Sequence, residues 1–470
     1  MTFERVAVID IGKTNAKVAL VDRTSLSEVA VRKIPNGVVE APPYPHVAVE
    51  RLWAFILDSL SALQAECGVD AIAVTTHGAC AALLRADGEL ALPILDYEHA
   101  GPESRAADYD ALRPDFAETG SPRLPAGLNL GAQLYWQQQR FPDRFGAARE
   151  MLTYPQYWAY RLTGVAAAEV TSLGCHTDLW EPGRNRYSSL VDRLGWRRLM
   201  PPLRHARDVL GPIRPEIATA TGLKANCPVV GGIHDSNASL LPHLMCEARP
   251  FAVVSTGTWV IAMAVGGDDV TLDPRRDTLV NVDADGQPVR SARFMGGRDH
   301  ARAIGAAEAR YGLDDLAAVV EREIMLLPAI EGGIGPFAGR SGGWTVPPET
   351  LSAAERAAAA ALYLASMTVT CLDMIGAGGT IVVEGSFTGD PILLALIAAL
   401  SGRKVKGAEA QTTGTSIGAA MLVAAGPKVS AVEARGPEAL GALLPAVRAY
   451  GQHWETAVTR DMGALYSVGA

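Results

Sequence analysis

The stretch that decides the fold is VAVIDIGKTNAKVALVD, residues 6–22. Two apolar runs in it predict two strands, and the small polar residues 12–15 between them predict a tight turn. A closely similar unit, FAVVSTGTWVIAMAV, returns at residues 251–265 and predicts a second hairpin around the turn 255–258. Two hairpins of one plan indicate an internal duplication.

Strands and helices alternate outside these hairpins, which is typical of α/β folds with mixed or parallel sheets. The clearest expected elements are a strand entering a polar turn in DAIAVTTHGACAALL (70–84), a helix in LTYPQYWAYRLTG (152–164) ended by Gly164, an Ala-rich helix over 353–374 capped by Ser352 with Glu355, a strand TIVVEG (380–385) and a helix from Pro391 capped by Asp390. The pattern restarts near residues 240–250. We therefore expect one domain over 1–243 and a second over 244–470.

Composition limits the class of protein. A chain of 470 residues exceeds a usual single core, and its 49% apolar and 20% charged residues fit a globular enzyme. The net charge of −9 argues against nucleic acid as a partner, and six scattered cysteines suit a reducing compartment without structural zinc. No stretch approaches the ~18 apolar residues of a membrane span, so we expect a cytoplasmic protein with no membrane partner.

The first turn has the residue types of a phosphate site. Gly12-Lys13-Thr14 resembles the end of a Walker A motif, but Ala7 stands where its first glycine belongs and a strand follows, so we reject that motif. Small turn residues can instead bring backbone N–H groups to a phosphate, with Lys17 as a cation and Asp10 holding Mg²⁺ through water. One such turn could be structural, but a matching second turn favours a polyphosphate held between the two domains.

The segment PVVGGIHDSNASLL (228–241) predicts a strand end that carries Asp235 beside two glycines. A carboxylate in that place suits a general base, and the alternative is that Asp235 only caps the following helix. Gly385, between a strand and a helix, leaves room for a planar ligand on bare backbone. His77 in the turn THGAC is a candidate contact for substrate hydroxyls, or else a structural histidine.

Order and content together resemble the FGGY family of carbohydrate kinases. The likeness runs from about Val6 to Gly426 and rests on seven segments in the family's order: DIGKTNAK (10–17), TTHGA (75–79), PILDYEHAGPESR (93–105), YPQYWAYRLTG (154–164), ATGLKANCPVVGGIHDSNASL (220–240), STGTW (255–259) and GTSIGAAMLVAAG (414–426). The resemblance implies two duplicated actin/hexokinase-like (ribonuclease H-like) α/β domains with the active site in a cleft between them.

The resemblance also implies roles for residues. Asp235 falls on the catalytic base, and Asp10 with Asp235 on the Mg²⁺ site. The expected ATP and phosphate contacts are Gly12, Lys13, Thr14, Asn15, Lys17, Ser255, Thr256, Gly257, Thr258, Gly385, Ser386 and Asp390. The expected sugar contacts are His77, Gly78, Glu98 and Asp235.

Four positions depart from the family's pattern. Lys13 replaces a small or hydroxyl residue, and Glu98 stands where a sugar-binding Asp is usual. In the adenosine loop Glu384 stands where a glycine is common, and Asp390 lies near a usual Asn. The chain looks closest to the branches that act on L-rhamnulose, L-fuculose or xylulose, and the sequence does not choose among them.

We therefore expect an ATP- and Mg²⁺-dependent kinase for a small sugar, with the sugar as partner and a homodimer as an option. Two alternatives stay open: an actin-like or chaperone-type ATPase, and a non-catalytic regulator that senses sugars.

Overall fold

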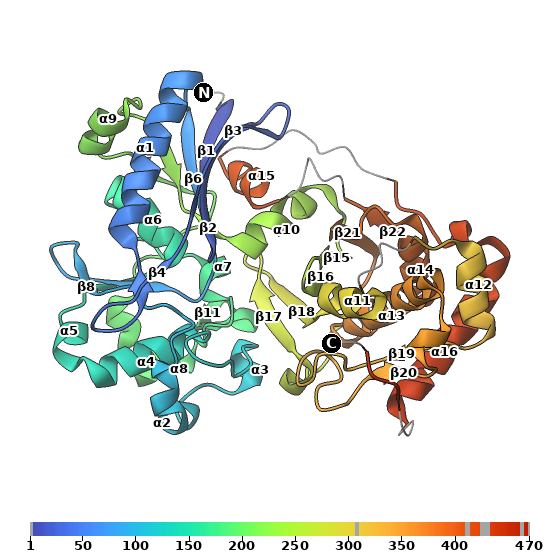
Figure 1. Ribbon diagram of the computed structural model, residues 1–470. Coiled ribbons are helices and arrows are strands. Elements are labelled where there is room, and N and C mark those ends of the chain that lie inside the picture. Colours follow the sequence, from blue (N-terminus) through green and yellow to red (C-terminus); the bar gives the residue numbers. More distant parts are fainter. Residues whose placement is uncertain (1–2, 306–309, 409–413, 424–432, 461–464, 469–470) are drawn as a thin grey trace. The chain divides into compact units, whose positions relative to one another are not determined.

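The computed structural model describes residues 3–305, 310–408, 414–423, 433–460 and 465–468. They form two compact α/β units (Figure 1). Unit 1 takes the described residues within 1–246, 280–288 and 411–429, and unit 2 takes the remainder. Each unit is thus assembled from several separate segments of the chain.

Unit 1 is built on a seven-stranded sheet with the order β12-β13-β6-β1-β2-β3, in which β14 also pairs with β6. Its strands are β1 (Arg5–Ile11), β2 (Asn15–Asp22), β3 (Ser27–Pro35), β6 (Ala71–Thr76), β12 (Val209–Pro212), β13 (Pro228–Val230) and β14 (Ile233–His234). The first three form an antiparallel meander, while β1, β6 and β14 run parallel to one another. The predicted first hairpin is confirmed, and because a strand follows the turn, so is the rejection of a Walker A motif.

The helices of unit 1 cover this sheet and a smaller one, β8-β7-β9. They are α1 (Val49–Cys67), α2 (Ala106–Asp110), α3 (Phe116–Thr119), α4 (Leu130–Arg140), α5 (Pro142–Gly146), α6 (Tyr154–Thr163), α7 (Val170–Leu173), α8 (Ser189–Arg193), α9 (Pro215–Thr221), α10 (Asp235–Cys246) and α15 (Thr415–Ala420). The shorter strands are β4 (Val38–Val39), β5 (His46–Val47), β7 (Ala81–Leu84), β8 (Leu90–Leu92), β9 (Glu150–Thr153), β10 (Trp180–Glu181) and β11 (Arg186–Tyr187). As predicted, α6 ends at Gly164, which adopts the left-handed conformation that glycine tolerates best.

A six-stranded sheet with the order β17-β18-β16-β15-β21-β22 belongs largely to unit 2, although residues 280–282 of β17 and Pro288 of β18 fall in unit 1. The strands are β15 (Phe251–Thr256), β16 (Val260–Val265), β17 (Thr278–Val282), β18 (Pro288–Phe294), β21 (Thr380–Gly385) and β22 (Val405–Gly407), with a small pair β19 (Leu326–Leu327) and β20 (Gly343–Trp344). The helices are α11 (Gly296–Ile304), α12 (Leu313–Glu321), α13 (Ala353–Met374), α14 (Pro391–Ser401) and α16 (Leu444–Thr459). The predicted second hairpin, the strand TIVVEG and the helix from Pro391 are confirmed.

The two sheets repeat one plan. In unit 1 the run β3-β2-β1-β6 has three antiparallel neighbours followed by a parallel strand, and β18-β16-β15-β21 does the same in unit 2. A long helix, α1 or α13, precedes the parallel strand in each case. This repetition confirms the predicted duplication of an α/β unit.

The long apolar helix α13 forms the centre of unit 2. Ser352 accepts the Glu355 N–H at 3.1 Å, and Glu355 accepts the Ser352 N–H at 2.8 Å, so the predicted capping box is present. By length and composition α13 is apolar enough to cross a membrane, contrary to the sequence expectation, but 83% of its most apolar window is buried within the protein. Its apolar surface is therefore used in the core.

Helices α10 and α15 of unit 1 pack at very close range where Gly418 meets Ala238. A Cβ placed on Gly418 would lie 1.7 Å from the carbonyl oxygen of Ala238 and 2.6 Å from its carbonyl carbon. Neither atom belongs to a flexible side chain, so a larger residue must push the helices apart. These helices begin at Asp235 and Thr415, so this contact also sets the spacing of two polar side chains.

We expect Gly418→Ala to destabilise unit 1 by about 3 kcal/mol, the upper part of the usual range for overpacking. The predicted result is a drop of about 6–12 °C in the melting temperature of unit 1, followed by differential scanning calorimetry. Gly37→Ala is the matched control, because a Cβ there meets nothing within 4 Å. Equal melting temperatures for the two variants would contradict the close packing.

Candidate functional site

Three polar side chains of unit 1 lie at the carboxyl ends of three neighbouring parallel strands. Asp10 is near the end of β1, His77 directly follows β6, and Asp235 directly follows β14. Both β1 and β14 pair with β6 in register, Asp10 with Thr75 and His234 with Thr76. The carboxyl ends of parallel strands are where α/β proteins bind ligands. The structure therefore brings together three side chains that the sequence singled out separately.

The Asp10 carboxylate is fixed by partners on two other elements. Its Oδ2 accepts a hydrogen bond from the Thr415 hydroxyl at 2.8 Å and lies 3.6 Å from the Lys17 ammonium. Lys17 also pairs with Glu28 at 2.9 Å. Burial raises the pKa of Asp10, Thr415 and Lys17 oppose that shift, and the charge of Asp235 adds to it. The two carboxylates thus repel each other across the strand ends.

Asp235 begins α10, and its side chain is 31% exposed. Its Oδ1 accepts the Ser236 N–H at 2.6 Å and lies 3.4 Å from Nε2 of His234. Burial raises the pKa of Asp235, while His77 and the Ser236 hydrogen bonds lower it. Both close contacts engage Oδ1, which leaves Oδ2 as the oxygen for a ligand.

The first turn is closed by its own backbone. The Gly12 N–H donates to the Asn15 carbonyl at 2.9 Å, and Asn36 donates from its side chain to the Gly12 carbonyl at 2.8 Å and from its N–H to the Thr14 carbonyl at 2.9 Å. The Asn15 amide donates to the Thr14 hydroxyl at 3.0 Å. The Gly12 amide is therefore occupied, and an anion at this turn would have to use other groups.

Lys13 reaches away from this turn toward the loop 93–99. Its ammonium pairs with Asp96, lies 3.2 Å from Glu98 and sits 4.5 Å above the Tyr97 ring. Burial lowers the pKa of Lys13, but the two carboxylates outweigh it and raise that pKa. Glu98 is 64% exposed, whereas Asp96 is 11% exposed. Lys13 thus connects the first turn to the loop that carries the predicted sugar contact.

His77 and Gly78 lie against aromatic and histidine side chains. The His77 ring is 5.4 Å from the Tyr97 ring and 5.0 Å from the Tyr154 ring, and its Nδ1 is 2.7 Å from the Gly78 carbonyl. Burial lowers the pKa of His77, so its neutral form is favoured. A Cβ on Gly78 would lie 2.8 Å from Nε2 of His234. Gly78 is therefore needed for the packing of His234, whatever contact it makes with a ligand.

In unit 2, Thr256 holds the end of β15 to the turn after β21. Its hydroxyl donates to the Glu384 carbonyl at 2.5 Å and accepts the Phe387 N–H at 3.1 Å, and its carbonyl accepts the Ser386 N–H at 2.9 Å. Gly385 is in the left-handed region at φ 89°, and a Cβ there would meet the Thr256 carbonyl oxygen at 1.9 Å. The Thr256 hydroxyl thus uses its donor and an acceptor site for hydrogen bonds within unit 2.

The tip of the second turn is open to solvent and backed by a helix. Thr258 is exposed, Ser255 and Gly257 are half-buried, and the Gly257 N–H donates to the Trp259 carbonyl at 2.9 Å. A Cβ on Gly297 would lie 2.1 Å from the Gly257 carbonyl oxygen, so the first turn of α11 packs directly on this tip. Thr258 offers the hydroxyl of this turn that faces solvent.

Asp390 acts as the predicted cap of α14. Its Oδ1 accepts the Ile392 and Leu393 N–H groups, both at 3.0 Å, and its Oδ2 accepts the Tyr311 hydroxyl at 2.8 Å. Both oxygens are engaged, so the cap is confirmed, and the ATP contact of Asp390 stays a prediction.

The donor set at the strand ends suits a hard divalent cation bound partly by a ligand. No group of three or more His, Cys, Asp or Glu side chains arranged for a metal occurs in the described residues. Mg²⁺ rarely needs such a group, because one or two carboxylates together with phosphate oxygens and waters satisfy it. The mutual repulsion of Asp10 and Asp235 would be relieved by a cation near them. These two residues therefore fit the predicted Mg²⁺ site.

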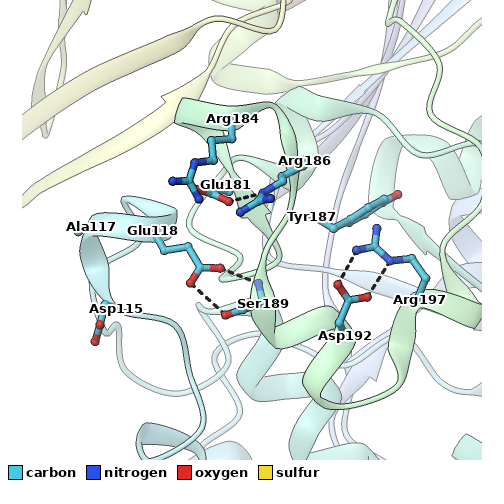
Figure 2. Close-up of a pocket in the computed structure, with 10 residues that line it drawn as sticks. All are labelled: Asp115, Ala117, Glu118, Glu181, Arg184, Arg186, Tyr187, Ser189, Asp192 and Arg197. Carbon is cyan, nitrogen blue, oxygen red and sulfur yellow. Dashed lines mark hydrogen bonds and ion pairs between the residues drawn. The ribbon is translucent and has the colours of Figure 1, made fainter.

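A polar pocket of about 590 Å³ lies elsewhere in unit 1 (Figure 2). Its lining includes Asp115, Glu118, Glu181, Arg184, Arg186, Tyr187, Ser189, Asp192 and Arg197. Figure 2 shows two ion pairs, Arg186 with Glu181 at 2.6 Å and Arg197 with Asp192 at 2.9 Å, while Glu118 accepts hydrogen bonds from Ser189. None of the residues predicted from the sequence lines this pocket, and its three arginines are already paired with Glu181 and Asp192, so we assign it no ligand.

Sequence reasoning missed several neighbours of the site. Thr415 stands at the start of an expected helix, a position that could have marked its hydroxyl as a candidate for the site. Asp96 lies two residues before Glu98 in the same motif, and the paired glycines that begin α11 were a signal for a close backbone contact at Gly297. Nothing in the sequence signalled that these residues would meet Asp10, Lys13 and Gly257.

Two family models match this chain. The N-terminal domain of the FGGY family of carbohydrate kinases matches residues 6–242, and the C-terminal domain of carbohydrate kinase FGGY matches residues 248–431. The crystal structure of a carbohydrate kinase from Novosphingobium aromaticivorans is 38% identical, with a TM-score of 0.90 over 98% of this chain and 99% of that one.

Curated relatives match over a shorter length. The L-fuculokinase of Salmonella typhi is 27% identical over 271 residues, which is 56% of this chain and 57% of that protein. The chain thus spans little more than half the length of this relative. A xylulose kinase structure from Lactobacillus acidophilus, 16% identical, has a TM-score of 0.76 over 98% of this chain and 99% of that one. At that identity the likeness concerns the fold.

Proposed function

Since the chain belongs to the FGGY family of carbohydrate kinases, we propose that it transfers the γ-phosphoryl group of ATP to a hydroxyl of a small neutral sugar, a ketose such as L-rhamnulose, L-fuculose or a ketopentose. The observation that carries this proposal is the meeting of Asp10, His77 and Asp235 at the ends of three parallel strands. The site residues predicted from the sequence supply the remaining contacts.

Asp235 is the group we assign as general base. Its Oδ1 is held by Ser236 and faced by His234, so Oδ2 is positioned to accept the proton of the attacking sugar hydroxyl. A base within hydrogen-bond reach of that proton raises the rate by about 10²–10⁴-fold. Phosphoryl transfer otherwise depends on alignment and charge neutralisation, because its transition state is loose and highly charged.

The remaining residues orient the ligands. Mg²⁺ held by Asp10 and Asp235 would neutralise charge on the phosphate oxygens. In unit 1 the predicted phosphate contacts are Thr14, Asn15 and Lys17. In unit 2 they are Ser255, Gly257 and Thr258. Gly385 and Ser386 are assigned to the adenosine.

The sugar side of the proposal rests on charge. The ammonium of Lys13 lies at the loop 93–99, where it pairs with Asp96 and Glu98. We therefore propose that Lys13 acts on the sugar side and does not contact phosphate. Together with Asp235, the carboxylates of Asp96 and Glu98 outnumber the one ammonium of Lys13. This excess of negative charge favours neutral hydroxyls, which donate hydrogen bonds to carboxylates, and it repels sugar acids. This balance is why a neutral sugar is proposed.

The test is ADP release from Mg-ATP across a panel of ketoses, polyols, their deoxy forms and aldonates. We expect one or more neutral ketoses to stimulate ADP release, with stoichiometric sugar phosphate detected by mass spectrometry. ADP release that does not depend on any sugar would support an ATPase instead, and no release with the whole panel would support a sugar-sensing regulator.

We expect Glu98→Gln to lower kcat/KM about tenfold for the best sugar, because a hydrogen bond from a hydroxyl to a charged acceptor is replaced by a neutral one. The KM for Mg-ATP should not change. Glu66→Gln is the control, since Glu66 is also a half-exposed partner in an ion pair, with Arg32. If the ranking of the sugars by kcat/KM does not change, Glu98 does not belong to the sugar site.

We expect Thr258→Val to raise the KM for Mg-ATP about tenfold without changing thermal stability, because it deletes an exposed hydroxyl at the tip of the turn. Thr256→Val is the contrasting variant. It should lower the melting temperature, since that hydroxyl joins β15 to the turn after β21. If Thr258→Val weakens sugar and nucleotide binding equally, the second turn does not serve the nucleotide alone.

A further inference from the structure

A buried carboxylate that the proposed mechanism does not use lies next to the base-carrying segment. Glu169 is 0% exposed and caps the short helix α7. In the described chain its carboxylate contacts Thr171 and Ser172: Oε1 accepts the Thr171 N–H at 3.0 Å, and Oε2 accepts the Thr171 hydroxyl at 2.5 Å and the Ser172 N–H at 3.2 Å. Burial raises the pKa of Glu169 to about 7, so this carboxyl is costly to charge where it lies, and a cap of a four-residue helix does not by itself require such a buried group.

The Thr171 hydroxyl transmits this contact to the backbone before Asp235. Its proton is donated to Glu169, so its oxygen is left as an acceptor, and it accepts the His234 N–H at 3.1 Å. The other side of β14 is paired with β6 at Thr76. The strand end is therefore held from both sides, one residue before Asp235.

The His234 side chain is held by the same segment. Its Nε2 lies 3.3 Å from Sγ of Cys175 and 3.4 Å from Oδ1 of Asp235. Burial lowers the pKa of His234 to about 4, so the ring is neutral near neutral pH. Because Nε2 faces a carboxylate oxygen, we place the single ring proton there. Gly78 lies against this ring, since a Cβ there would be 2.8 Å from Nε2.

We propose that Glu169 and Thr171, which we call the α7 clamp, are positioning residues for the phosphoryl transfer, because they fix His234 and through it the orientation of the Asp235 carboxylate. This inference rests on the proposed function of Asp235 as general base. Misplacing a reacting group by about 1 Å can cost about 10²-fold in rate, so a clamp one residue away affects turnover without touching the substrate.

The test compares Thr171→Val, Thr171→Ser and Glu169→Gln. Thr171→Val should lower kcat about 10- to 100-fold and leave the KM for Mg-ATP within twofold. Thr171→Ser keeps the hydroxyl and should stay within about threefold of wild type. Glu169→Gln should behave like Thr171→Val, because an amide cannot accept at both of its ends. A loss of kcat in Thr171→Val that comes with an equal rise in the KM for Mg-ATP, or that is as large in Thr171→Ser, would mean that the clamp is only structural.

Hydrogen exchange of the amides at 233–236 gives a readout without sugar or turnover. Thr171→Val should speed exchange there at least about tenfold relative to Thr171→Ser, while exchange in β6 stays unchanged. Equal exchange in the two variants overturns the clamp. Absence of sugar phosphorylation by the wild-type protein overturns the proposed function instead, so the two failures are distinguishable.

Discussion

Asp235→Asn should lower kcat by at least about 10²-fold while the protein folds normally and still binds Mg-ATP. The substitution nearly preserves volume, and the amide can still accept the Ser236 N–H through its oxygen, so the start of α10 should remain intact. What disappears is the oxygen that takes the proton of the sugar hydroxyl, a contribution of about 10²–10⁴-fold for a general base. Stopped-flow turnover and nucleotide titration calorimetry measure the two effects separately.

The pH profile gives a second readout for Asp235. A base works only when deprotonated, and burial raises its pKa above the ordinary aspartate value, so wild-type kcat/KM should fall as pH falls through that raised pKa. Asp235→Asn should lack this limb. Ser236→Ala is the matched control: it keeps the N–H that binds Oδ1 and should remain within a few-fold of wild type. Wild-type kcat in Asp235→Asn would reduce this residue to a helix cap.

Asp10→Asn should also lower kcat by about 10²-fold or more, with a higher Mg²⁺ concentration needed for half-maximal rate. The variant removes one of two carboxylates available to the cation, but the Thr415 hydroxyl can still donate to the amide oxygen. Charge stabilisation of the transferring phosphoryl group by the cation is worth several kcal/mol, at about 1.4 kcal/mol per tenfold in rate.

Glu28→Gln separates the metal role of Asp10 from its pairing with Lys17. Glu28 holds the same ammonium at 2.9 Å but belongs to β3, outside the three parallel strands. We expect this control to keep its Mg²⁺ dependence. If Asp10→Asn and Glu28→Gln change the Mg²⁺ requirement equally, Asp10 acts through Lys17 and not on the cation.

Local patterns in the sequence were sufficient for the elements that depend on near neighbours. The two hairpins follow from alternating apolar runs around small residues. The cap at Ser352 and the stop at Gly164 follow from residue types within one helical turn. The α/β alternation predicted mixed or parallel sheets, and the structure adds that β1 pairs in parallel with β6 and in which register.

The rest of the site depends on contacts between distant residues. Thr415 meets Asp10 across 405 positions, and Lys13 meets Asp96 across 83. Periodicity describes one element at a time and carries no information about which elements pack together. Glu169 was missed for a related reason, because an acidic residue before a threonine reads as a plain cap until the burial of its carboxylate is known.

The return of the chain to unit 1 at Thr415–Ala420 has a consequence during protein synthesis. Ile417, Ala419 and Leu422 share one buried apolar cluster with Val6, Val8 and Ile233, which are made far earlier. At about 5–20 residues per second, roughly 9–35 s pass on the ribosome between residue 246 and residue 420. Throughout that interval the nascent chain exposes the apolar surface that α15 later covers. Chaperone binding to ribosome-stalled chains should therefore persist until α15 has emerged, and chains cut before residue 414 should aggregate although they contain the base and its clamp.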